Sequence, residues 1–269
     1  MSFRDLHAPG NPFILANAWD VGSAKMLAGL GAQAIGTSSS AHAFTLGRVD
    51  GGTVTRDEAL AHAADLVAAV NVPVSGDFEN GFGDAPEDCA ETVRLSAEVG
   101  LAGISIEDTA FPDGSAYPFD LAVERIAAAA SAARALAGDF VMVARADGVL
   151  NGTYDIEEAL KRITAFDEAG ADCLYVPFPK SQDDLKRVIA ATAKPVNVLV
   201  AGPYAKLSQQ DYAAMGAARL SLGSALANVV QRTIFDAGSA MLGDGDFSPL
   251  LNGISGKKID ALLNGTFQA

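Results

Sequence analysis

The segment VPVSGDFENGFGDAPEDCAETVRLSAEVGLAGISIED, residues 72–108, contains one complete strand–helix–strand repeat. A short apolar run at 72–79 is followed by apolar residues three and four positions apart at 87–99, and then by a second apolar run at 103–108. The helical spacing predicts an amphipathic helix, and the two short runs predict buried strands. Gly100 separates the helix from the second strand, as a glycine after a helix end commonly does. The segment therefore predicts one unit of a parallel α/β sheet.

The same alternation recurs along the rest of the chain. Further strand-like runs lie at 13–19, 34–38, 140–145, 173–178, 195–200 and 218–223, and further helical stretches lie at 56–70, 157–169 and 181–191. Eight such units in about 250 residues are typical of a (β/α)8 TIM-type barrel. A doubly wound open sheet is the alternative, but residues 19–23 after the first strand (WDVGS) lack its glycine-rich nucleotide-binding turn. The barrel is the favoured fold.

The C-terminal segment lies beyond the eighth unit. Residues 257–263 predict an additional helix, and its apolar face needs a partner. We expect residues 1–269 to form a single barrel domain, with 252–269 as a C-terminal helical extension.

Charge and cysteine content restrict the partners and the compartment. The chain has 19 Lys and Arg against 33 Asp and Glu, a net charge of −14. Such a surface repels nucleic acid and anionic membranes, whereas a local cationic site can still bind a small carboxylate substrate. The two cysteines, Cys89 and Cys173, are too few for a disulfide scaffold, and the N-terminal residues do not resemble a secretory signal. We expect a cytoplasmic protein that binds neither nucleic acid nor membranes.

Acidic residues gather where several predicted strands end. Chemistry in a parallel barrel takes place at the C-terminal ends of the strands, where this sequence places Asp77, Glu79, Glu107 and Arg145. Asp77 and Glu79 are two residues apart, so a continuing strand would point both carboxylates to the same side. A cluster of hard oxygen ligands selects Mg²⁺, with Mn²⁺ as an alternative, and the lack of a His or Cys near these acids in the sequence argues against Zn²⁺.

Other polar residues at the strand ends are suited to carboxylate binding. The backbone N–H groups of Ser38, Ser39 and Ser40 can bind a carboxylate, although these serines could equally form a loop or a helix N-cap. Arg145 suits bidentate capture of a carboxylate or simple pairing with a neighbouring acid. Trp19 ends the first strand and could line the pocket floor or pack in the core. Asp84 precedes a helical run and is expected to cap it.

Four segments together carry a family resemblance. They are residues 46–50 (LGRVD), 72–83 (VPVSGDFENGFG), 103–108 (GISIED) and 143–147 (VARAD). With the serines at 38–40, they make the chain resemble the isocitrate lyase/phosphoenolpyruvate mutase superfamily over residues 11–223. The specific feature is an acid-x-acid motif followed by Gly-aromatic-Gly, with a Glu-Asp pair further along the chain.

The resemblance implies a barrel whose last helix is exchanged between subunits of a homotetramer, a dimer of dimers. It also implies a Mg²⁺ ion held largely through water by Asp50, Asp77, Glu79 and Glu107. Family members bind a 2-oxo acid or its enolate on this metal, with further contacts from Ser38, Ser39 and Arg145. Arg145 and Asp50 are accordingly the expected catalytic residues, and Ser38, Ser39, Ser40, Asp77, Arg145 and Trp19 are the expected substrate-binding residues.

One loop departs from the family pattern. The carbon–carbon lyases carry a catalytic Cys in a Lys-Lys-Cys-Gly-His loop after the fourth strand, but residues 109–118 here (TAFPDGSAYP) have no Cys, Lys or His. The loop also lacks the Lys- and Asn-bearing gate of the mutase and of phosphonopyruvate hydrolase. We therefore expect a lyase-type reaction through a metal-stabilised enolate, with decarboxylation of an oxaloacetate-like acid favoured. Tyr117, Asp113, Ser115 or water is the candidate proton donor.

Two alternatives to this function remain open. One is a mutase or hydrolase directed at phosphonopyruvate. The other is a non-catalytic protein that binds 2-oxo acids.

Overall fold

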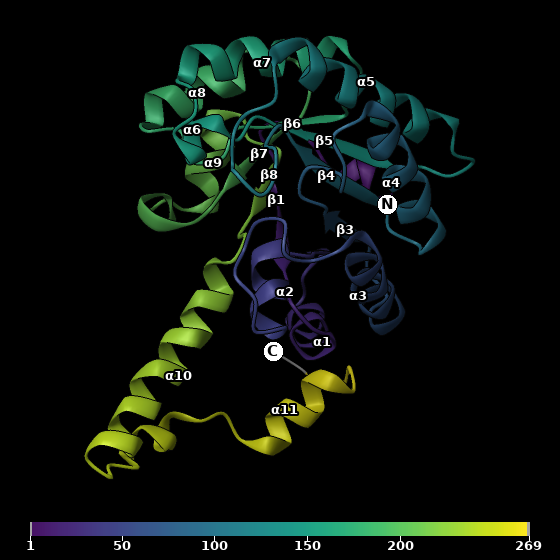
Figure 1. Cartoon of the computed structure of the whole chain (residues 1–269). Coiled ribbons are helices and arrows are strands. Elements are labelled where there is room, and N and C mark those ends of the chain that lie inside the picture. Colours follow the sequence, from purple (N-terminus) through teal and green to yellow (C-terminus); the bar gives the residue numbers. More distant parts are fainter. Residues whose placement is uncertain (1, 268–269) are drawn as a thin grey trace.

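The computed structural model describes residues 2–267, and its centre is a closed barrel of eight parallel strands in chain order (Figure 1). The strands are Phe13–Asn17 (β1), Ala34–Gly36 (β2), Val74–Asp77 (β3), Gly103–Glu107 (β4), Val141–Arg145 (β5), Cys173–Tyr175 (β6), Val196–Leu199 (β7) and Arg219–Ser221 (β8). β1 pairs with both β2 and β8, which closes the sheet. The predicted (β/α)8 barrel is confirmed, and the open sheet is excluded.

Helices surround the barrel and connect its strands. Between β1 and β8 they are Val21–Gly29 (α1), Ser39–Thr45 (α2), Arg56–Ala69 (α3), Pro86–Glu98 (α4), Phe119–Ala135 (α5), Gly148–Asn151 (α6), Ile156–Glu168 (α7), Gln182–Ala190 (α8) and Gln209–Met215 (α9), with a short 3-10 turn at Gly202–Lys206 (η2). Another 3-10 turn, Arg4–Leu6 (η1), precedes β1. Gly100 and Gly170 follow α4 and α7 with φ of +90° and +104°, a conformation that side chains disfavour. The four helices that the spacing predicted, at 56–70, 87–99, 157–169 and 181–191, are present as α3, α4, α7 and α8 within one residue of those bounds.

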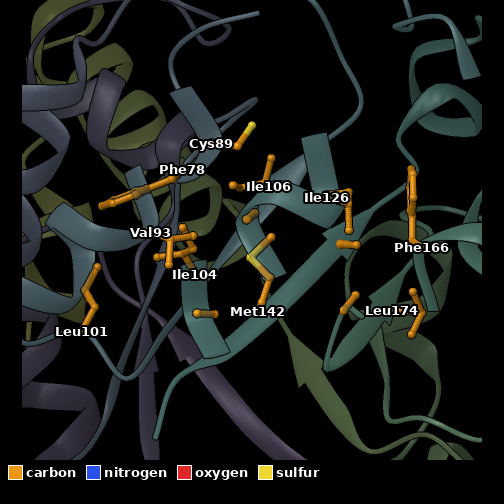
Figure 2. Close-up of a cluster of buried hydrophobic side chains, with 14 of the residues drawn as sticks. Phe78, Cys89, Val93, Leu101, Ile104, Ile106, Ile126, Met142, Phe166 and Leu174 are labelled. Carbon is orange, nitrogen blue, oxygen red and sulfur yellow. The ribbon is translucent and has the colours of Figure 1, made fainter. Parts of the chain in front are cut away.

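The main hydrophobic core lies between the strands and the outer helices. Ile104 and Ile106 on β4 and Met142 on β5 point outward and are fully buried (Figure 2). They pack against the inner faces of the helices, which contribute Val93 from α4 and Ile126 from α5. Because alternate strand residues face outward, the remaining positions are left to line the barrel interior.

The barrel interior is apolar in part and polar near its C-terminal end. Phe13, Leu15, Val143 and Cys173 belong to one buried cluster inside the sheet. Arg219 and Ser221 occupy alternate positions on β8, and both line the cavity that opens at the C-terminal ends of the strands. The interior is therefore closed by apolar packing toward one end and leads to a polar site at the other.

The chain leaves the barrel after β8 and later returns to it. Ala225–Gly243 (α10) extends away from the barrel, and the chain comes back through the 3-10 turn Ser248–Asn252 (η3) to Gly256–Leu263 (α11), which lies beside α1 (Figure 1). Leu262 of α11 is buried against Gly29. The additional helix predicted within 257–263 is present, and residues 268–269 of the predicted extension lie outside the described residues. None of the helices described in residues 2–267 is long and apolar enough to cross a membrane.

Candidate active site

Two adjoining cavities open at the C-terminal ends of the strands. The deeper cavity has a volume of about 240 Å³, and its wall includes the predicted residues Ser38, Ser39, Ser40, Asp50, Asp77 and Arg145. The second, of about 220 Å³, is lined by Ser39, Asp50, Glu79, Glu107, Arg145 and Asp147, among others. The structure thus brings together every predicted site residue except Trp19. The indole of Trp19 lines neither cavity, and its backbone N–H and carbonyl bond to Ser23 and His62.

Arg145 is the central cation of the site. Its Nη1 lies 2.7 Å from Asp77 Oδ1, and its Nη2 lies 2.9 Å from Glu107 Oε2 and 2.6 Å from Asp147 Oδ2. Burial alone would lower the pKa of Arg145, but the three carboxylates together raise it well above its ordinary value. The guanidinium is therefore permanently charged and is held in place by three different acids.

The turn after β2 orients Asp77 from the other side. Ser38 caps α2, since its Oγ accepts a bond from the N–H of Ala41 at 3.3 Å. The next residue, Ser39, donates to Asp77 Oδ2 through its backbone N–H at 3.1 Å and its hydroxyl at 2.9 Å. The helix-cap reading holds for Ser38, and the N–H of Ser39 faces the same cavity that Asp77 lines.

Glu79 reaches the site by a route that strand alternation does not predict. β3 ends at Asp77, and Glu79 has φ of +44°, in the left-handed region. Its carboxylate accepts a bond from the N–H of Gly52 at 3.2 Å, which ties it to the loop that carries Asp50. The position of Glu79 at the barrel mouth is as expected, but a turn rather than the pleat of a strand places it there.

The carboxylates of the site carry more negative charge than Arg145 neutralises. Burial raises the pKa of Glu79 to about 7, and the nearby Asp77 and Asp50 add to this effect. Burial also raises the pKa of Asp50, with a contribution from Asp77. The pKa of Glu107 is raised well above its ordinary value, again mainly by burial. Acids held this close together gain stability from any cation that joins them.

Comparison with known proteins bears on the same residues. The family model described as phosphoenolpyruvate phosphomutase matches residues 3–242, a range that contains all the residues of the site. The chain belongs to this family.

Relatives of the chain include both solved structures and named enzymes. A crystal structure from Burkholderia cenocepacia J2315, provisionally named a lyase/mutase, superimposes with a TM-score of 0.92 at 43% identity, covering 96% of this chain and 93% of the other. The 2,3-dimethylmalate lyase of Eubacterium barkeri is 32% identical over 193 residues, 69% of this chain and 65% of the relative. The oxaloacetate decarboxylase of Rhodopseudomonas palustris strain BisB18 is 32% identical over 196 residues, 71% of this chain and 66% of the relative. The predicted superfamily membership and the prediction of an enzyme are confirmed.

The donor set of the site suits the hard cation expected for the family. The carboxylates of Asp50, Glu79 and Glu107 line one cavity together and supply only oxygen ligands, which match Mg²⁺. Within residues 2–267, however, no three His, Cys, Asp or Glu side chains are placed to ligate one ion directly. A divalent ion here would therefore keep several of its waters, as Mg²⁺ commonly does.

Several residues near the family's catalytic loop have other roles in this member. Tyr117 donates its hydroxyl to Asp84 at 2.6 Å and accepts a bond from Asn80, so Asp84 does not cap α4 as the sequence suggested. Asp113 and Ser115 bond to each other on the surface. None of the three candidate proton donors lines either cavity.

The two cysteines are also remote from any catalytic role. Both are free and buried, and burial raises the pKa of each thiol, Cys89 and Cys173, to about 11. Neither forms the reactive thiolate that a catalytic cysteine needs at neutral pH.

Sequence reasoning missed part of the cavity wall. Asn17, Tyr175 and Arg219 line the deeper cavity; Asn17 and Tyr175 end β1 and β6 just as Asp77 and Arg145 end β3 and β5, whereas Arg219 begins β8. For Arg219 a signal was available, because it is a charged residue at an alternate position of the apolar run 218–223. A charge inside a strand that is otherwise buried indicates a partner within the barrel.

Proposed function

We propose that this protein is a Mg²⁺-dependent lyase that acts on a small 2-oxo carboxylate, with decarboxylation of an oxaloacetate-like acid as the favoured reaction. The observation that carries the proposal is the excess of buried carboxylates around Arg145 at the C-terminal ends of β3, β4 and β5. Similarity to an oxaloacetate decarboxylase and to 2,3-dimethylmalate lyase supports the same class of reaction.

The residues of the cavity would bind and orient the substrate. The carboxylate next to the 2-oxo group would replace Asp77 as the acceptor from Arg145 Nη1 and from the Ser39 N–H, which both donate to Asp77 in the structure. In decarboxylation, the bond between C3 and the distal carboxyl carbon breaks, CO2 leaves, and the electron pair moves into an enolate. Water supplies the proton at C3, because no acidic side chain of the loop 109–118 lines the cavity.

Asp50, Asp77, Glu79 and Glu107 are the residues that would hold the metal, in part through water. When bound, Mg²⁺ would supply a positive charge close to the enolate oxygen, an effect worth several kcal/mol to the transition state. Removal of the metal by a chelator should therefore lower the rate of turnover.

The test is a substrate panel with and without metal. Oxaloacetate, 2,3-dimethylmalate, 2-methylisocitrate and phosphonopyruvate are each incubated with enzyme and Mg²⁺, and products are followed by NMR of carbon and phosphorus. We expect turnover of oxaloacetate above its uncatalysed rate, lost with EDTA and restored by Mg²⁺. Turnover of phosphonopyruvate alone would assign the protein to phosphorus–carbon chemistry. Tight oxalate binding without any product would make it a binding protein.

We also propose that α10 packs against a second copy of the chain. Large apolar side chains on this arm are exposed, with Ile234 at 66%, Phe235 at 67% and Leu242 at 90%. Such a surface is typical of a subunit interface. Light scattering after gel filtration should give a homotetramer, and Phe235→Asp should reduce the mass. A monomeric wild-type protein would contradict the exchange of the last helix.

A further inference from the structure

Arg219 is a buried charge without a partner. It belongs to β8, its side chain lines the 240 Å³ cavity, and the residue is only 4% exposed. Its Nε and Nη1 atoms have no hydrogen-bond partner, and no carboxylate within residues 2–267 lies at ion-pair distance from it. Arg145, the other guanidinium in the same wall, already pairs with three acids.

No neighbouring group supplies the missing negative charge. Burial raises the pKa of the Cys173 thiol to about 11 and also raises the pKa of the Tyr175 hydroxyl, so both are neutral at pH 7. Asp77 is committed to Arg145 and Ser39. Burial lowers the pKa of Arg219, but an arginine does not lose its proton in a protein at neutral pH. A buried guanidinium of this kind is stabilised only by an anion.

Polar atoms near Arg219 are also unsatisfied. Asn197 is its register partner on β7 and donates its Nδ2 to Ser221 Oγ at 2.8 Å, while its Oδ1 has no partner. The hydroxyl of Ser75, in the wall of the same cavity, is likewise unpaired. Asn197 itself does not line the cavity, but Arg219 and Ser75 do, and polar groups with unmet hydrogen bonds in a cavity wall mark a place where a ligand or ordered water binds.

We propose that Arg219 binds the distal carboxylate of the oxaloacetate-like substrate at the floor of the cavity. The planar fork of a guanidinium matches a carboxylate with two parallel hydrogen bonds. One cavity contains both Arg219 and Arg145, so a small diacid can place one carboxylate at Arg219 and the other where it replaces Asp77 as a partner of Arg145. This inference rests on the proposed function for the assignment of the Arg145 end to the 2-oxo acid group.

The experiment compares a diacid with its monoacid analogue. Succinate and propionate are titrated by calorimetry into wild-type protein and the variants Arg219→Met and Arg219→Lys, with Arg187→Met on the exposed face of α8 as a control. We expect Arg219→Met to weaken succinate binding by about 30-fold or more, the scale expected when a buried charge loses its partner. Propionate binding should not change. Arg219→Lys should restore part of the succinate affinity, because it keeps the charge and loses the fork.

Melting temperature separates binding from a structural role. Without ligand, Arg219→Met should melt at or above the wild-type temperature, because it removes an uncompensated charge from the interior. A variant that melts lower and loses both ligands equally would overturn the proposal. So would chloride or sulfate protection that depends on Arg219 while succinate and propionate bind alike, since the site would then hold a free anion.

Turnover gives an independent measurement. With oxaloacetate, the Arg219→Met variant should show a raised KM at a kcat closer to that of the wild type. If no substrate of the panel turns over, the proposed function fails, whereas the titrations of succinate and propionate still decide whether Arg219 binds a carboxylate.

Discussion

Glu107 and Asp108 are adjacent acids at the end of β4, yet their surroundings are opposite. Glu107 faces the barrel mouth, lines the second cavity and contacts Arg145. Asp108 is 3% exposed and faces away into a closed network. It accepts hydrogen bonds from Arg162 at 2.9 Å, from the Tyr154 hydroxyl at 2.7 Å and from the N–H of Asp147 at 2.8 Å.

The difference between the two acids shows which property distinguishes a group that can act on a substrate from one that supports the structure. Burial raises the pKa of both Glu107 and Asp108, so an altered pKa does not distinguish them. What distinguishes them is whether the polar atoms are satisfied inside the protein. Asp108 has no capacity left for a ligand and instead fixes the backbone of Asp147, which in turn holds Arg145. We expect groups facing the cavities to control turnover, and groups sealed behind them to control stability.

The largest expected effect is a loss of turnover when Asp77, which lines the cavity, is changed. Replacing Asp77 by Asn keeps the shape of the side chain but removes one of the charges around Arg145. We expect kcat/KM to fall by about 10²–10³-fold, the scale seen when one electrostatic contact to a transition state is lost. The melting temperature should change little, since Glu107 and Asp147 still hold Arg145. The measurement is steady-state kinetics on the substrate identified by the panel.

Asp113→Asn is the matched control for Asp77→Asn. Asp113 is an exposed acid in the loop after β4, and its removal should leave kcat/KM unchanged. An Asp77→Asn enzyme with wild-type turnover would remove Asp77 from the site. A large loss in Asp113→Asn would instead reinstate the loop as a source of protons.

The second prediction concerns the closed hydrogen-bond network around Asp108. Asp108→Asn leaves Arg162 buried with only Glu158 as a charged partner, at 2.9 Å. Breaking one side of a buried ion pair typically costs 3–5 kcal/mol, and we expect the free energy of unfolding to fall by about 3 kcal/mol. Urea denaturation at neutral pH measures this loss. The double variant with Arg162→Met should lose less than the sum of the two single changes, and strict additivity would show that the pair is not coupled.

Parts of this contrast were predictable from the sequence. The helical spacing and the terminal glycines predicted the strand and helix positions, because local periodicity reports which face of an element is buried. The position of Asp77, Glu107 and Arg145 at strand ends predicted a shared mouth, because parallel strands end at the same edge of a barrel. The sequence could not distinguish Glu107 from Asp108, since the partner that seals Asp108 is Arg162, 54 residues further along the chain.

Other features depend on tertiary structure in the same way. Glu79 reaches the site through a left-handed turn, and its carboxylate is held there by a hydrogen bond from Gly52, in a distant loop. Asp84 precedes a helix as a capping residue would, but the hydroxyl of Tyr117 competes for it. Long-range hydrogen bonds of this kind leave no periodic signal, so position in the chain alone gives the wrong role.

The smallest expected effect is a pH dependence of stability at His62, which lines a separate cavity of only about 10 Å³ beside Asp77 and Glu79, too small for a substrate. His62 stacks on His42 with ring centroids 3.8 Å apart, and its Nε2 lies 3.0 Å from the carbonyl oxygen of Trp19. Burial lowers the pKa of His62 to about 4, and the charge of His42 contributes. Because the unfolded chain binds the proton near the ordinary pKa of about 6.5, the stability is complete above that pH and is lost as the pH falls toward 4.

We expect this histidine to reduce the free energy of unfolding by about 2 kcal/mol between neutral pH and pH near 4, since its pKa differs by more than one unit between the two states. Urea titrations at both pH values should show a smaller difference for His62→Gln than for the wild type. The kcat/KM of this variant at neutral pH should stay near that of the wild type, because a sealed group supports the fold without contacting substrate. If His62→Gln keeps the full pH dependence of stability but loses turnover, His62 acts with the cavity residues. That result would contradict the assignment of His62 to the groups that control stability alone.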